Sequence, residues 1–371
     1  KEDHDDTELE THATYLREGF EGKIAFEHEV GELRGVFGLH GLFDEFKIEG
    51  EESIFSGLSK VWELNNNGTP GDPLDDFNES KSSPSNPAIS AEESSRIALF
   101  LLEEYDLSDD TTLNAGIRWE SISRDYQGTA DRDDSTFSAS GGVSHDLSDL
   151  WNLSGNLSYA ERTPDSAELY SDGAHHATES YEIGNPNLDN ESAVGLEIII
   201  RKSVGNVTGQ FSAFHTRFND YIFHEDTGNK RDTEGNLPDE GQFPDPLHGF
   251  PADTEALPER QYEAVDAEFQ GLEIEIDWLA MENPGWNLLL STYGDILRGK
   301  NKTEGGNLPR IPAGSLGVGF EIQAEKLRFG MDLNNVFKQN RIAVHEEEEE
   351  EEEEHGHEHG ETATPSYSLL N

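Results

Sequence analysis

The polar stretch Tyr159–Leu188 (YAERTPDSAELYSDGAHHATESYEIGNPNL) lies between two segments of a different character. Before it, in Trp151–Tyr159 (WNLSGNLSY), apolar and polar residues alternate, and similar patterning resumes in Ser192–Arg201 (SAVGLEIIIR). Alternation with a period of two predicts strands that have one apolar and one polar face. The stretch is therefore predicted to be a long polar connection between two strands, where binding residues are often found.

The residues of this connection resemble a pattern of the TonB-dependent outer-membrane receptors. In that family, a strand ending in a Tyr-Ala-Glu-Arg-like run leads to P-x-x-x-E-L-Y and then to E-x-G-N-P-N-L before the next strand. The insert Gly173–Thr178 (GAHHAT) is most similar to the branch associated with uptake of zinc and other metals. The residues that match the family motif are Arg162, Pro164, Glu168, Leu169, Tyr170, Glu182, Gly184, Asn185, Pro186, Asn187 and Leu188.

Landmarks elsewhere in the chain extend the resemblance. Arg96–Tyr105 (RIALFLLEEY) and Leu113–Glu120 (LNAGIRWE) resemble a hairpin of these receptors, and Phe211–Ile222 (FSAFHTRFNDYI) resembles a later strand. Further similar segments are Gln270–Glu275, Asn307–Pro312 and, approximately, Leu333–Lys338. The resemblance implies a barrel of about 22 strands behind an N-terminal plug. Residues 1–371 show no counterpart of the plug and are interpreted as one fragment of the barrel.

Strand patterning along the whole chain predicts an all-β, antiparallel, transmembrane barrel of the outer-membrane type. Tight turns alternate with long loops, as in such barrels, whereas a soluble β-sandwich or propeller more often has short turns at both ends. No run approaches the roughly 18 apolar residues of a spanning helix. We predict about fourteen of a probable 22 strands, without the plug. They lie near Glu8–Leu16, Glu21–Val30, Leu33–Glu49, Ser53–Trp62, Ser95–Leu107, Thr111–Tyr126, Phe137–Asp146, Trp151–Glu161, Ser192–Val204, Val207–His224, Glu259–Met281, Trp286–Arg298, Gly314–Ala324 and Leu327–Phe337.

The composition narrows the classes of partner. Only 33% of the residues are hydrophobic, which a barrel tolerates because its lumen and outer loops are polar. The formal net charge is −52, and the nine consecutive glutamates Glu346–Glu354 account for a small part of it. This charge argues against nucleic acid and favours cations as partners, although acidity also serves solubility in a salty medium. The chain has no cysteine, so thiolate metal sites and disulfides are not available to it.

Residues Lys338–Pro365 are predicted to form an acidic, His-rich extracellular loop, the strongest candidate for metal binding. His345 precedes the glutamates, and His355, His357 and His359 follow them at alternate positions. Imidazole and carboxylate groups suit Zn²⁺, and Ni²⁺ or Cu²⁺ as well. A flexible loop loses conformational entropy on closing around an ion, so binding would be weak and exchangeable. The alternative is a low-complexity loop that only remains hydrated.

Two smaller groups of histidines are further candidates. His175 and His176 lie in the insert, where a loop conformation would let both converge on one metal ion; the alternative is that they are ordinary polar loop residues. His215 and His224 are nine residues apart, so on an unbroken strand they would point to opposite faces. The possible additional residues of a metal path are His215, His224, Glu225 and Asp226, with a structural role as the alternative.

These observations predict import of a metal ion, most simply zinc, as the transported ligand and not as a catalytic cofactor. The resemblance implies a place in the outer membrane of a Gram-negative bacterium, contact with its lipid, and coupling through the plug to the inner-membrane TonB complex. One alternative is a receptor for a siderophore, haem or another metal complex; another is a surface protein that binds metal or mediates adhesion without transport. No G-x-S-x-G, H-E-x-x-H or P-loop motif occurs, so no enzyme activity is predicted.

Overall fold

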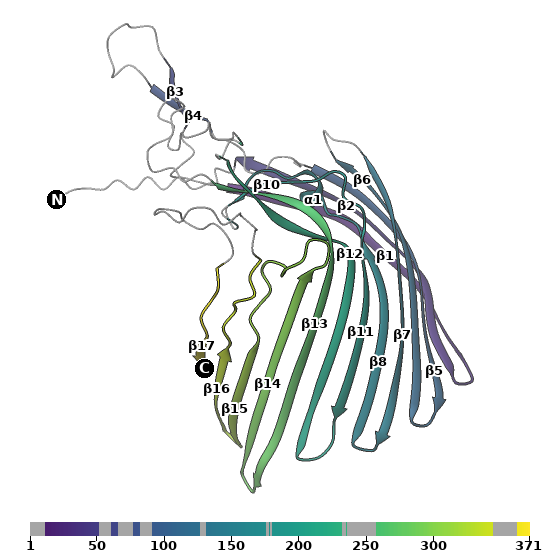
Figure 1. The fold of residues 1–371 in the computed structure, drawn as a ribbon. Coiled ribbons are helices and arrows are strands. Elements are labelled where there is room, and N and C mark those ends of the chain that lie inside the picture. The colour runs from purple at the N-terminus through teal and green to yellow at the C-terminus, as the bar shows by residue number, and fades with distance from the viewer. Residues whose placement is uncertain are drawn as a thin grey trace, which may run out of the picture.

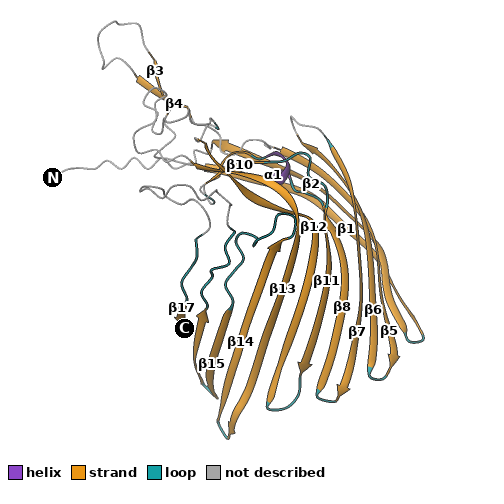
Figure 2. Cartoon of the chain, viewed as in Figure 1, coloured by secondary structure: helices purple, strands orange, loops and turns teal. Residues whose placement is uncertain are grey.

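One large curved sheet dominates the computed structural model, which describes residues 12–51, 61–65, 77–81, 91–126, 131–175, 178, 180–231, 235, 257–343 and 362–371. Figure 1 shows the strands side by side, tilted alike and curved like the wall of a barrel. Figure 2 shows that almost all of the described chain is strand. The predicted all-β, antiparallel architecture is confirmed.

Thirteen strands follow one another across this sheet in chain order, each antiparallel to the next. The described part of the predicted strand Glu8–Leu16 and the predicted strand Glu21–Val30 belong to one strand, because pairing with the next strand continues without interruption from His12 to Val30. Most of the predicted strand Ser53–Trp62 lies outside the described residues. Its last two residues, Val61 and Trp62, belong to a separate hairpin of β3 (Val61–Asn65) and β4 (Phe77–Lys81). The thirteen strands are β1 (His12–Val30), β2 (Leu33–Glu51), β5 (Ala91–Ser108), β6 (Thr111–Tyr126), β7 (Arg132–Ser148), β8 (Trp151–Arg162), β11 (Glu191–Lys202), β12 (Val207–Arg231), β13 (Leu257–Asn283), β14 (Trp286–Asn301), β15 (Ser315–Ala324), β16 (Leu327–Val336) and β17 (Tyr367–Leu370).

The two faces of the sheet differ as a membrane barrel requires. On β6, Leu113, Ile117 and Trp119 are exposed on one face, whereas Arg124 and Tyr126 on the other face are buried. The exposed apolar face is the one that meets lipid. Tight turns join strands at the lower edge in Figure 1, and longer connections leave the upper edge. Short turns are typical of the periplasmic rim, so the upper edge is extracellular. Within the described residues, no helix is long and apolar enough to cross a membrane.

A bulge redirects the long hairpin of β12 and β13 above the sheet. Phe218 pairs with Ala267 and Tyr221 with Val265, so β12 carries one extra residue, and Asp220 adopts a positive φ of 55°. A bulge bends its strand and shifts the alternation of side chains. Figure 1 shows the hairpin curving away from the sheet above this level.

The bulge overturns the prediction that His215 and His224 point to opposite faces. They pair with Gln270 and Tyr262, which are eight residues apart on β13 and therefore share a face. The prediction assumed an unbroken strand. The extra residue of the bulge places both histidines on the same face.

The described part of the connection between β8 and β11 contains a helix and two strands and is not simply a polar loop. It contains the short helix α1 (Ser166–Tyr170) and strands β9 (Asp172–His175) and β10 (Ser180–Ile183). β10 pairs antiparallel with β9 and parallel with β13, with Glu182 opposite Arg260. This pairing fixes the connection to the bent hairpin at the mouth of the barrel wall.

Candidate functional site at the barrel mouth

Arg162, the last residue of β8, ties together both ends of this connection. It donates to the two carboxylate oxygens of Glu168 at 2.8 and 2.9 Å and to those of Glu191 at 3.1 Å each. Such paired contacts fix orientation as well as position. Burial by itself would lower the pKa of Arg162, but its hydrogen bonds to the two carboxylates raise that pKa above the ordinary value. Glu191 also accepts the Ile222 N–H of β12 at 3.0 Å, so one guanidinium joins β8, α1, β11 and β12.

Helix α1 begins with a capping box and packs closely on the chain that follows it. Asp165 Oδ1 accepts the Glu168 N–H at 2.9 Å, and Glu168 Oε2 accepts the Asp165 N–H at 2.8 Å. The Gly184 N–H donates to Ser171 O at 2.6 Å, and a Cβ on Gly184 would lie 2.4 Å from Tyr170 N. Only glycine allows this approach.

A small apolar core holds the connection against the sheet. Leu169 of α1 and Leu188 are buried against Tyr126 of β6 and Ile222 of β12. The Arg162 network and this core together indicate that most of the motif residues are structural: they hold the connection against the sheet. Glu182 is the exception, because its carboxylate is directed at histidines.

Glu182 is the centre of the candidate site. Only 3% of its surface is exposed. Its Oε1 lies 2.9 Å from His175 Nδ1 and accepts a hydrogen bond from Thr178 Oγ1 at 2.8 Å. Its Oε2 lies 3.7 Å from His224 Nε2. One buried carboxylate thus stands between histidines from β9 and β12.

His224 is held as a neutral imidazole. Its ring centroid lies 3.8 Å from that of Tyr262, and its side chain is 12% exposed. Burial lowers the pKa of His224 to about 4; Glu182 opposes this, whereas Arg310 and Arg260 reinforce it. The Nε2 atom is buried without a hydrogen-bond partner among the described residues. A neutral imidazole with a free nitrogen is the form that binds metals.

Arg260 and Arg310 bring positive charge close to the same carboxylate. Arg260 Nη1 donates to Thr178 O at 3.4 Å. Burial, and then the neighbouring Arg310, lower the pKa of Arg260. Both guanidiniums act electrostatically on His224. The mouth therefore combines two imidazoles, of which that of His224 is neutral, the buried Glu182 carboxylate and two cations.

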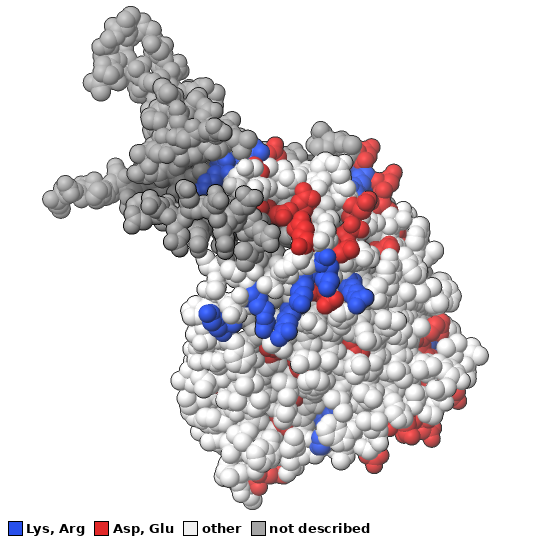
Figure 3. Space-filling view, viewed as in Figure 1, with Lys and Arg blue, Asp and Glu red and all other residues white. Residues whose placement is uncertain are grey.

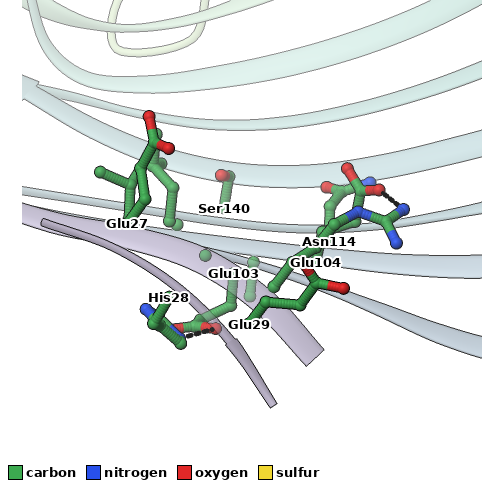
Figure 4. Close-up of a pocket in the computed structure, with 13 residues that line it drawn as sticks. Glu27, His28, Glu29, Glu103, Glu104, Asn114 and Ser140 are labelled. Carbon is green, nitrogen blue, oxygen red and sulfur yellow. Dashed lines mark hydrogen bonds and ion pairs between the residues drawn. The ribbon is translucent and has the colours of Figure 1, made fainter. Parts of the chain in front are cut away.

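A groove of about 700 Å³ lies at the other end of the sheet, near the turn between β1 and β2 (Figure 4). His28 Nε2 lies 3.2 Å from Glu103 Oε2, above Gly35, where a Cβ would lie 2.5 Å from the Glu103 carboxylate. Arg34 forms ion pairs with Glu104 and with Asp106. Because these pairs engage the histidine and the arginine of the groove, we assign no ligand to it.

The family is decided by a comparison with protein-family models. The model described as "TonB dependent receptor-like, beta-barrel" matches residues 12–371. The chain belongs to this family. Its members are outer-membrane proteins of Gram-negative bacteria, which agrees with the predicted location.

Solved structures resemble this receptor barrel in fold. The copper transporter OprC has a TM-score of 0.66 at 17% identity, covering 96% of this chain and 48% of OprC. The siderophore receptor PirA from Acinetobacter baumannii has a TM-score of 0.56 at 14% identity, with coverage of 97% and 48%. The ferric enterobactin receptor PfeA from Pseudomonas aeruginosa, as a double mutant, has a TM-score of 0.57 at 19% identity, with coverage of 96% and 46%. The receptor barrel thus spans about half the length of these proteins.

The structure brings two of the candidate metal ligands together and separates others. His175 and His224 meet at Glu182, which the sequence identified only as a motif residue. His215 lies further down β12, opposite Gln270. Asp226 pairs in the ladder with Arg260, on the same face as His224, and its carboxylate accepts the Gly228 N–H at 3.0 Å. The candidates that lie outside the described residues are His176, His345, His355, His357 and His359.

Glu225, the remaining candidate, pairs in the ladder with Gln261 and so lies on the face opposite to His224. Across the described part of the chain, no group of three or more His, Cys, Asp or Glu side chains has the spacing of a metal site. Arg260 and Tyr262 were missed from the sequence. Their contacts depend on the pairing of β13 with β10 and β12 across long connections, which no local pattern reveals.

Proposed function

We propose that this receptor barrel serves the uptake of a metal ion, most simply zinc, and that His175, Glu182 and His224 provide the ligands at its mouth. The observation that carries the proposal is the buried Glu182 carboxylate between two imidazoles. Uptake would be coupled to the inner-membrane TonB complex through a plug, as the family resemblance implies. The solved structure described as a copper transporter, which shares the fold, supports a metal ion as cargo.

The geometry suits transient binding. Two ligands of one tetrahedral zinc ion lie roughly 3.3 Å apart, given bonds of about 2.0 Å. His224 Nε2 and Glu182 Oε2 are 3.7 Å apart, so a small shift would let them share an ion. His175 would have to exchange its contact with Glu182 for the metal. A site that does not supply all the ligands of the metal ion favours rapid release of that ion, which transport requires.

The acidic loop Lys338–Pro365 is proposed as a feeder for this site. Its histidines and glutamates would raise the local cation concentration before an ion passes to Glu182. The loop lies mostly outside the described residues, and the proposal for it rests on the sequence.

A second function is favoured by the two arginines. Arg260 and Arg310 disfavour a bare cation near His224 but would attract an anionic metal complex, such as a ferric siderophore. The solved structures described as siderophore receptors, which share the fold, keep this candidate open.

One substitution separates the two functions. In the protein isolated from its outer membrane, Arg260→Gln removes a cation beside the site. If the cargo is a bare ion, zinc measured by titration calorimetry should bind a few-fold more tightly, because a repulsive charge is gone. If the cargo is an anionic complex, zinc affinity should not rise and a ferric siderophore should bind more weakly.

Arg201→Gln is the matched control, because Arg201 lies near the periplasmic end of β11 and contacts Gln210 there. It should change neither affinity. Absence of zinc binding in the unaltered protein, together with tight binding of the siderophore, would overturn the zinc proposal and leave the receptor fold intact.

A further inference from the structure

An ion pair lies on the face of the sheet that meets lipid. His28 of β1 pairs in the ladder with Gly35 of β2, which pairs with Glu103 of β5, so the three residues share one row and one face. His28 Nε2 lies 3.2 Å from Glu103 Oε2. Figure 4 shows the two side chains directed toward one another and away from Glu27, the neighbour of His28 on β1.

Apolar and aromatic side chains surround this pair along the barrel wall. Phe26 and Val30 flank His28 at alternate positions of β1 and are exposed, which identifies the face as the outer one. The rows above and below the pair are Phe26, Phe37, Leu101 and Ile117, and Val30, Leu33, Tyr105 and Leu113. Figure 3 shows a broad band with few charged side chains on the outer surface. The pair therefore lies inside the apolar band, near the periplasmic turn of β1 and β2.

This position leaves the pair with an unmet demand for polar contacts. Charged groups on a lipid-facing surface are costly, although less so toward the interface. The side chains of His28 and Glu103 are 29% and 24% exposed. Among the described residues, His28 Nδ1 is buried without a hydrogen-bond partner. Lipid chains offer neither a donor nor an acceptor, so the pair gains from a polar partner that excludes lipid.

The backbone beneath the pair has no side chain to obstruct it. A Cβ on Gly35 would lie 2.5 Å from Glu103 Oε2, so glycine is what lets Glu103 reach across β2 to His28. In the same row, Glu103 pairs with Ala115 and Ala115 with Gly141. Between membrane helices, small residues allow two backbones to approach closely. This row of small residues offers the same to a second barrel wall.

An acid and a base at one height are complementary to a second copy of the same surface. A two-fold axis along the membrane normal preserves height and brings each side chain opposite its counterpart of the other kind. We propose that two receptor barrels associate through this face, with His28 of each copy contacting Glu103 of the second copy. A phospholipid headgroup that carries one ammonium group would engage only Glu103, whereas a second copy engages both side chains.

The contact leaves the mouth of each barrel free. In the sheet, the strands β6, β7, β8 and β11 separate β5 from β12. A two-fold axis along the membrane normal also keeps both mouths on the extracellular side. Zinc binding at the mouth should therefore be the same in the monomer and in the dimer, and the association does not depend on the proposed function.

Sedimentation equilibrium of the protein isolated from its outer membrane, in a density-matched detergent, tests the association. The unaltered protein should dimerise at micromolar concentration. His28→Glu places like charges opposite one another and removes two polar contacts per dimer, so association should weaken at least about 10-fold. The swap variant, His28→Glu with Glu103→His, restores an acid opposite a base and should dimerise as the unaltered protein does.

Glu18→Gln is the matched control, because Glu18 is exposed on the same face of β1 toward its extracellular end. It should leave the association unchanged, and circular dichroism should show that every variant is folded. A monomeric unaltered protein, equal association of His28→Glu and the control, or a folded but monomeric swap variant would each overturn the proposal. Native mass spectrometry could also overturn it, by detecting a monomer with a bound ethanolamine phospholipid that Glu103→Gln loses, which would assign the pair to a headgroup.

Discussion

At the scale of single residues, the motif that identifies the family also explains why the mouth is rigid. Arg162, Glu168 and Glu191 form one network, and Gly184 allows α1 to pack against the chain after β10. The sequence was sufficient to identify Arg162, Glu168 and Gly184, because they belong to a recognisable pattern. Glu191 was missed, because it lies outside that pattern. It was not sufficient to separate Glu182 from the scaffold residues, because that distinction depends on which side chains converge in space.

Removing the Arg162 guanidinium should loosen the connection. In Arg162→Met, Glu168 and Glu191 lose their shared partner while remaining largely buried, which destabilises the local structure by roughly 1–3 kcal/mol after allowance for the partial exposure of Arg162. Hydrogen exchange of the α1 and β10 amides should accelerate accordingly. Arg201→Met, at the other end of β11, serves as the control. Unchanged protection in Arg162→Met would show that the network does not hold the connection.

The β-bulge requires a left-handed backbone conformation at Asp220. Its φ of 55° lies in the left-handed region, which β-branched residues adopt at a cost. Asp220→Val should destabilise the bent hairpin by about 1–2 kcal/mol, whereas Asp220→Gly should be neutral or slightly stabilising. Exchange protection of the β12 amides near Ile222 would report both effects. If Val and Gly behave alike, the positive φ is not required.

At the scale of elements, the β12–β13 hairpin and the β8–β11 connection form the site together. The strands themselves were predictable from alternation, and Thr111–Tyr126 matches β6 at both ends. α1, β9 and β10 were not predicted, because each is too short for a period to emerge. The bulge was also missed, since Asn219 and Asp220 resemble any polar pair within a strand.

The outer end of the hairpin should loosen in acid. Burial raises the pKa of Glu259, but hydrogen bonds from Arg231, Thr227 and Asn229 outweigh it, so the pKa lies below its ordinary value of 4.5. A depressed pKa means that the carboxylate contributes stability above the unfolded value and loses it as pH falls through the folded value.

Exchange protection near Arg231, corrected for intrinsic rates, should therefore fall as the pH drops below the ordinary glutamate pKa of 4.5 and through the lower pKa of Glu259. In Glu259→Gln it should already be lower at neutral pH and should vary less with acid. Equal pH dependence in both proteins would exclude Glu259 as the group responsible.

At the scale of the whole molecule, the strands that the structure describes form an open wall. Among the described strands, β1 pairs only with β2 and β17 only with β16. This agrees with a chain that spans about half the length of the similar solved receptors. The family and the fold were accessible from the sequence, because strand patterning and motifs are local. The cargo was not, because it depends on how several loops meet above the wall.

Zinc titration calorimetry on the protein isolated from its outer membrane tests the central claim most directly. The double variant His175→Ala, His224→Ala is compared with His145→Ala, His215→Ala, which removes two histidines outside the mouth. The account predicts saturable zinc binding that weakens at least roughly 10-fold in the mouth variant and is unchanged in the control. Equal zinc affinity in the two variants would contradict it.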